Sequence, residues 1–180
     1  RGIAGETVGS RIARAGAYDL QSTLRLLRDV GSALSYLHDS GQVHGGIGRE
    51  TVWATPMGRI WMLGWQWAVP LTDIRGNRRA DSPWSIGPAE WKHVWKPTPA
   101  SDQWQLAALC FQALTCEAPP PNGARPGSLV RPDFPQRMAE VLDNAPPPDP
   151  ANPFASVSAM LRAADKVMGA RANVMSSGEV

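Results

Sequence analysis

One long segment with helical periodicity constrains the fold of this chain more than any other feature. Between Asp19 and His38, apolar side chains recur every three or four residues, and Gly41 follows just past the end. The repeat consists of Leu20, Leu24, Leu27, Val30, Leu34 and Leu37. Such a stripe covers one face of an α-helix, so residues 19–38 are predicted to form a core helix.

A second segment, residues 101–115, is apolar on nearly every side. A helix of about four turns with this composition belongs at the centre of a domain. Asp102 stands near its start and has a side chain typical of helix N-caps. We therefore expect Asp102 to cap a buried central helix.

The rest of the helical signal is weaker and more local. Five prolines exclude a helix from 144–153, and the terminal residues 169–180 are expected to form a frayed tail. Shorter amphipathic helices are predicted at 7–15, 134–142 and 155–167.

Two short β segments stand between the long helices. Residues 52–54 and 59–63 are rich in β-branched, aromatic and apolar side chains, and Pro56, Met57 and Gly58 between them supply turn chemistry. This arrangement predicts a β-hairpin.

The composition limits the number of domains and the kinds of partner that we expect for this chain. The chain has 180 residues, of which 43% are hydrophobic, which suits one compact domain. With 19% charged residues and a net charge of +2, no nucleic-acid partner is expected. There is no run of about 18 apolar residues and no signal-peptide layout at the start, so we expect a cytoplasmic protein without membrane insertion.

The cysteines are expected to be reduced. Cys110 and Cys116 lie six residues apart in one predicted helix, roughly 240° around it, where they cannot bridge each other. We interpret both as core thiols. Two cysteines and three histidines also make a structural zinc site improbable.

Two runs of the sequence resemble protein kinases of the Ser/Thr type. Residues 24–44 are similar to the long kinase helix that delivers the catalytic loop, and 101–115 to the Ser-Asp-Val-Trp-Ser-Leu-Gly pattern and its buried helix. The resemblance covers about residues 5–168. It implies a mainly α fold with a short β-hairpin: the large C-terminal lobe of a kinase at residues 1–168, without the small lobe.

The catalytic residues of that family are replaced in this chain. The family pattern is His-Arg-Asp-x-Lys-x-x-Asn, then a hairpin and Asp-Phe-Gly. Here His44 keeps the His position, Gly46 replaces the catalytic Asp and Gly48 the Lys. Thr51 and Gly64 replace the Asn and Asp that bind magnesium. The resemblance thus implies a pseudokinase with no catalytic residue, cofactor or metal.

Positions that serve architecture in the family are occupied. His44 and Trp65 fall on two loop positions that stack together there, and Asp102 falls where an Asp bonds the backbone of the His loop. Glu90 belongs to an element similar to Ala-Pro-Glu, although its usual Arg partner is absent. The resemblance assigns these four residues to the structural core.

Two further expectations concern the segments around the hairpin. Thr72 and Ser82 stand where kinases carry the activation segment, and they are candidate phosphorylation sites on what is more simply a solvated loop. Trp53 falls on the position that lies beneath adenine in the kinase family, so the resemblance implies that it either fills the nucleotide pocket or packs on a partner. An ordinary hairpin tryptophan in the core is an equal alternative.

The sequence contains eight tryptophans, and several cluster near the hairpin. Trp53, Trp61, Trp65 and Trp67 are expected near the upper face of the lobe, with Trp53, Trp61 and Trp67 as anchors for a partner protein. We therefore expect a non-catalytic scaffold or assembly subunit. The alternative is a fragment of a split or processed kinase-like enzyme that binds nucleotide only with a complementary chain. A nucleic-acid binder is disfavoured by the small net charge.

Overall fold

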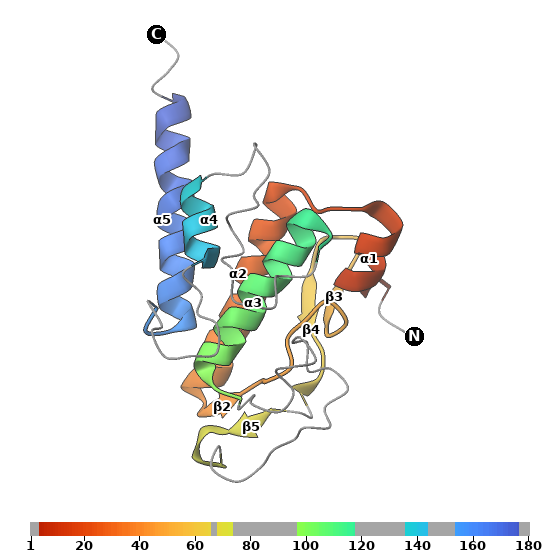
Figure 1. The fold of residues 1–180 in the computed structure, drawn as a ribbon, viewed down its shortest axis with the longest axis vertical. Coiled ribbons are helices and arrows are strands. Elements are labelled where there is room, and N and C mark those ends of the chain that lie inside the picture. Colours follow the sequence, from red (N-terminus) through yellow and green to blue (C-terminus); the bar gives the residue numbers. More distant parts are fainter. Residues whose placement is uncertain (1–3, 66–67, 74–96, 118–135, 144–153, 177–180) are drawn as a thin grey trace.

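The chain folds into a mostly helical, mixed α/β structure with small antiparallel sheets (Figure 1). The computed structural model describes residues 4–65, 68–73, 97–117, 136–143 and 154–176. The expectation of a mainly α fold with a short hairpin is confirmed at this level.

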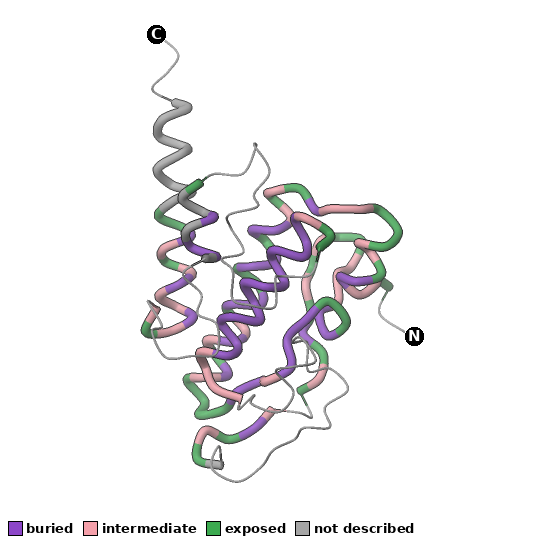
Figure 2. Tube along the Cα trace, in the orientation of Figure 1, coloured by how far each residue is buried: buried purple, intermediate pink, exposed green. Residues whose placement is uncertain are grey.

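Two long helices form the centre of the structure. Helix α2 (Leu20–Asp39) packs against α3 (Pro99–Thr115), and every residue of α3 from Ser101 to Leu114 is buried (Figure 2). Asp19 caps α2, because its carboxylate accepts a hydrogen bond from the backbone N–H of Ser22 at 2.7 Å. The predicted pair of core helices is confirmed.

The start of α3 differs from the prediction. Thr98, not Asp102, is the N-cap: its hydroxyl accepts from the Ser101 N–H, and the Ser101 hydroxyl accepts in return from the Thr98 N–H. Pro99 takes the first helical position, where its missing N–H costs nothing. Asp102 therefore lies one turn inside the helix, and its carboxylate can accept hydrogen bonds from groups outside the helix.

The two cysteines also differ from each other. Cys110 is wholly buried in α3, as expected. Cys116 is exposed and follows the last turn of α3 as its C-cap in a left-handed conformation, with φ of 63°. The prediction of two core thiols is wrong for Cys116, because the helix ends one residue before it.

The predicted hairpin is present. Strand β3 (Val52–Ala54) pairs antiparallel with β4 (Ile60–Met62), and the chain turns at Gly58, whose φ is 74°. A third strand, β1 (Glu6–Thr7), pairs with the other side of β3. A second small sheet joins β2 (Gln42–Val43) to β5 (Val69–Pro70), which is followed by a 3-10 turn at Leu71–Asp73.

The remaining helices flank this centre. Helix α1 (Val8–Ala15) follows β1, while α4 (Gln136–Asp143) and α5 (Val157–Ser176) lie together, with α5 packed on α2. Helix α5 continues to Ser176, so most of the segment expected to be a frayed tail is helical. No helix in the described part of the chain combines the length and apolar character that a bilayer crossing demands.

Candidate functional site

Asp102 joins three elements at the candidate site. Its side chain is 0% exposed, and its carboxylate accepts hydrogen bonds from the backbone N–H groups of His44 at 2.9 Å and Gly45 at 2.8 Å. The His38 ring, at the end of α2, lies 2.8 Å from the same carboxylate through Nε2. One buried side chain of α3 thus fixes both the loop that begins at His44 and the end of α2.

His44 is held in one neutral tautomer. Its ring is 1% exposed, and its Nε2–H donates to the carbonyl oxygen of Leu63 at 2.9 Å. Because a carbonyl can only accept, Nδ1 is left unprotonated, and it accepts from the Gly46 N–H at 3.3 Å. The ring also meets Trp65 edge to face, with centroids 5.5 Å apart. The two residues are in contact, although Trp65 is itself 44% exposed.

Burial lowers the pKa of His44 below its ordinary value of 6.5, and the nearby Asp102 carboxylate and Leu63 carbonyl only partly oppose this. In the unfolded chain His44 regains the ordinary pKa, so below about pH 6.5 the unfolded state binds a proton that the folded state resists. The free energy of unfolding should therefore fall as the pH drops from 6.5 toward 5.

A His44→Gln variant tests this pH dependence. Glutamine keeps an N–H that can reach the Leu63 carbonyl but does not titrate. Wild type should lose stability more steeply than the variant across this window, by up to about 1.4 kcal/mol per pH unit, and the two slopes should coincide above pH ~7. Urea unfolding at several pH values measures both slopes. Parallel slopes from pH 5 to 6.5 would contradict the lowered pKa.

The loop after His44 is closed by its own polar groups. The Thr51 hydroxyl accepts from the Gly48 N–H at 2.9 Å and donates to the Gly46 carbonyl at 2.8 Å. The side-chain oxygen of Gln105, on α3, accepts from the Ile47 N–H at 2.9 Å. Thr51 is 4% exposed and Gln105 is 2% exposed. The Thr51 hydroxyl is therefore engaged in holding the loop.

Gly45 and Gly46 offer a matched pair for testing this loop. Gly45 has φ of 71°, and an added Cβ would lie 3.0 Å from Cβ of Pro97. Gly46 has no positive φ, and a Cβ there would meet only Nδ1 of His44, at 4.0 Å. We expect Gly45→Ala to cost about 1–2 kcal/mol of unfolding free energy and Gly46→Ala less than about 0.5. Equal losses in urea unfolding would contradict this geometry.

Trp53 lies in the middle strand of the larger sheet. It pairs with Thr7 on one side and Trp61 on the other, and it is half-buried. Its indole packs under Gly5, where an added Cβ would lie 2.4 Å from Nε1. That nitrogen is buried and has no hydrogen-bond partner in the described part of the chain. Trp53 is thus covered partly by the segment leading into β1.

Three large apolar side chains on β4 and just after it remain open to solvent. Trp61 is 45% exposed, Leu63 is 42% exposed and Trp65 is 44% exposed. Trp61 lies on β4, and Leu63 and Trp65 follow its end. Trp65 is anchored because its indole N–H donates to the Met62 carbonyl at 2.7 Å. We call these three residues the tryptophan surface.

Of the other residues that the sequence singled out, some lie near the hairpin or in the 3-10 turn, and some fall outside the residues that the structure describes. Gly64 lies between Leu63 and Trp65 with φ of 88°, and Thr72 is exposed in the 3-10 turn. Trp67, Ser82 and Glu90 lie outside the described residues.

Sequence reasoning did not single out His38 or Gln105, both of which support the His44 loop. Gln105 could have been identified from the sequence, because an amide side chain inside an otherwise apolar helix needs a hydrogen-bond partner.

Within the described ranges, no three or more His, Cys, Asp or Glu side chains gather as metal ligands. No protein-family model and no curated protein matches the chain. The geometry of the loop and hairpin is therefore the basis for inferring function.

Proposed function

We propose that this chain is a catalytically inactive, kinase-like C-terminal lobe that serves as a protein-binding scaffold or assembly subunit in the cytoplasm. The observation that carries the proposal is the tryptophan surface of Trp61, Leu63 and Trp65, which stands beside a loop held rigidly by Asp102. Tryptophan is the residue most enriched among energetic anchors of protein interfaces.

The residues of the His44 loop support the proposal that the chain is catalytically inactive. Phosphoryl transfer needs a carboxylate to accept the hydroxyl proton and oxygen ligands for magnesium. The corresponding positions Gly46, Gly48 and Gly64 have no side chain, and the hydroxyl of Thr51 already bonds the backbone of its own loop. The polar groups present are used to hold the loop's shape.

The geometry of the tryptophan surface supports the proposal that the chain binds another protein. Trp61 stands on a hairpin that is fixed by pairing to β1, and Leu63 and Trp65 follow this hairpin. There the Leu63 carbonyl accepts from His44 and the Trp65 indole donates to the Met62 carbonyl. A rigid apolar surface loses little conformational entropy on binding, so it suits a protein partner. The partner we propose is another protein or subunit that covers this face.

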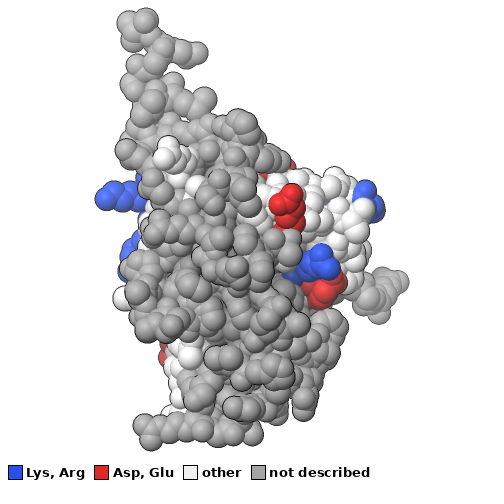
Figure 3. Space-filling view, viewed as in Figure 1, with Lys and Arg blue, Asp and Glu red and all other residues white. Residues whose placement is uncertain are grey.

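The charge distribution does not favour a nucleic acid. Described charges of both signs are scattered over the face shown in Figure 3, and the net charge is +2. A nucleic-acid site needs a continuous positive stripe that displaces counterions from phosphates.

Photo-crosslinking tests the partner surface. A photo-reactive phenylalanine placed at Trp61, in the cells that make this protein, should yield a crosslinked protein of one discrete size. The matched control is the same residue at Tyr36, an aromatic position of α2 that is 76% exposed and does not belong to the tryptophan surface. We expect no discrete product at Tyr36. Equal crosslinking at both positions, or at neither, would contradict a specific protein interface.

A nucleotide titration tests the inactive lobe. Adding magnesium to the chain in the presence of ATP should leave its melting temperature unchanged, because no described group of ligands suits the metal. A ligand present at about 100 times its dissociation constant would add ~2.7 kcal/mol, which is readily detected. A magnesium-dependent rise would instead support the split-enzyme alternative.

A further inference from the structure

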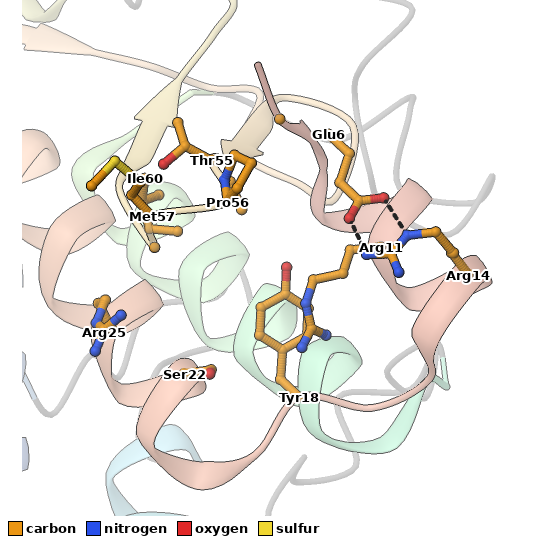
Figure 4. A pocket seen from close by; sticks show the side chains of 13 residues that line it. Glu6, Arg11, Arg14, Tyr18, Ser22, Arg25, Thr55, Pro56, Met57 and Ile60 are labelled. Atoms are coloured by element: carbon orange, nitrogen blue, oxygen red, sulfur yellow. Dashed lines mark hydrogen bonds and ion pairs between the residues drawn. The ribbon is translucent and has the colours of Figure 1, made fainter. Parts of the chain in front are cut away.

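A pocket of about 520 Å³ lies between α1, the first turns of α2 and the turn of the hairpin (Figure 4). It is separate from the His44 loop and the tryptophan surface. Its size falls within the range of small-molecule sites in proteins. Pro56, Met57 and Ile60 of the hairpin supply apolar lining, and Arg11, Arg14 and Arg25 supply basic lining.

The three arginines of the lining are not equivalent. Arg14 is neutralised by Glu6, the acidic residue of the lining, through two hydrogen bonds. Arg25 is exposed and reaches across Gly58 of the hairpin turn. It interacts electrostatically with Asp29 but forms no close ion pair within the described residues.

Arg11 interacts electrostatically with Glu6 and Asp19 but likewise forms no close ion pair within the described residues. Its guanidinium stacks on the ring of Tyr18 at 3.8 Å. The pocket therefore carries an excess of positive charge.

Tyr18 supplies the most informative observation. The residue is only 3% exposed, and its hydroxyl has no hydrogen-bond partner in the described structure. Figure 4 shows the hydroxyl directed toward the hairpin side of the pocket. Nη1 of Arg11 is also buried without a partner. A buried unsatisfied polar group costs about 1–3 kcal/mol, so two in one pocket indicate a missing acceptor.

Both unsatisfied groups act as donors. A guanidinium has no acceptor, and burial raises the pKa of Tyr18, so its hydroxyl keeps its proton at neutral pH. An acceptor that also carries negative charge would satisfy the hydroxyl and balance the arginines.

We propose that this pocket binds a small organic oxyanion, in which a phosphate monoester or carboxylate group is attached to a compact apolar body. The oxyanion accepts hydrogen bonds from Tyr18 and Arg11 and pairs with Arg25, while the apolar body rests on Met57 and Ile60. The inference is independent of the scaffold function, because it uses none of the residues of the tryptophan surface.

Calorimetric titration of the full chain tests the proposal with three probes of one shape: phenyl phosphate, benzoate and benzyl alcohol. We expect one or both anions to bind and the alcohol to bind at least tenfold more weakly, since only the anions satisfy the donors. The stronger of the two anions identifies the natural headgroup as phosphate or carboxylate. Binding of the alcohol as tight as that of the anions, or no binding of either anion at about 10 mM, would overturn the proposal.

Variants assign the binding to this pocket. Arg11→Met and Arg25→Met should each weaken anion binding at least about fivefold, and Tyr18→Phe by a similar factor. Arg28→Met is the matched control, because it removes the same charge from α2 but at a residue paired with Asp165 away from the pocket. It should change the affinity by less than twofold. Equal effects of Arg25→Met and Arg28→Met would overturn the assignment.

Tyr18→Phe also separates binding from folding. Its hydroxyl has no partner in the described structure, so its removal should not lower the melting temperature of the free chain. Unchanged stability with weakened anion binding is the expected signature of a ligand-binding hydroxyl. A loss of stability with unchanged binding would show a structural role and contradict the proposal.

Discussion

Replacing Asp102 by alanine is expected to lower the free energy of unfolding by about 3–5 kcal/mol. The substitution leaves the N–H groups of His44 and Gly45 without their acceptor and the ring of His38 without its partner. Asp102 is wholly buried, so water cannot replace the carboxylate without opening the packing of α3 on the loop. Because each hydrogen bond to a charged group contributes about 1.5–3 kcal/mol, the loss should be among the largest for any single polar residue.

Urea unfolding of Asp102→Ala beside Asp165→Ala measures this effect. Asp165 also accepts from a cationic side chain, Arg28, but that pair is more than half exposed. Its loss should cost less than about 1 kcal/mol. A cost for Asp102→Ala as small as that of the control would show that the loop does not depend on this carboxylate.

The second large effect is expected in the apolar core. Leu34 is 0% exposed on α2, the helix that packs against both α3 and α5. Leu34→Ala removes apolar contacts and leaves a cavity that two rigid helices cannot close, so the free energy of unfolding should fall by about 2–5 kcal/mol. The midpoint of urea unfolding reports this loss, provided that the slope of the transition is unchanged.

Tyr36→Ala is the matched control on the same helix. It deletes a larger side chain that is 76% exposed, and alanine is the better helix former. Its effect should stay within about 0.5 kcal/mol. If both substitutions cost the same, Leu34 would not occupy the core position that its burial indicates.

The helices could be predicted from the sequence where one local pattern dominates. The stripe from Leu20 to Leu37 has a single interpretation, and the α2 bounds agree with it to within one residue. At the start of α3 two caps competed: Asp102 has the preferred side chain, but Thr98 with Pro99 and Ser101 forms a complete capping box one turn earlier. A single-residue preference was outweighed by a reciprocal pair of hydrogen bonds.

The candidate site depended on contacts that are distant in sequence. Asp102 and His44 are 58 residues apart, and no periodicity of either segment brings them together. The resemblance suggested that contact, but it did not suggest the roles of His38 or Gln105. The basic pocket was missed because Arg11 and Tyr18 belong to a segment with only weak local signals, and their unsatisfied donors become visible only in three dimensions.

Because the two cysteines differ in burial, their alkylation rates can report how often the core of the chain opens. Burial raises the pKa of the Cys110 thiol to about 12, so almost none of it is the nucleophilic thiolate while α3 is packed. Cys116, one residue beyond that helix, is open to an alkylating reagent in the folded state. Once Cys116 has been blocked, the rate at which Cys110 reacts measures how often the centre of the molecule is exposed, without any added probe.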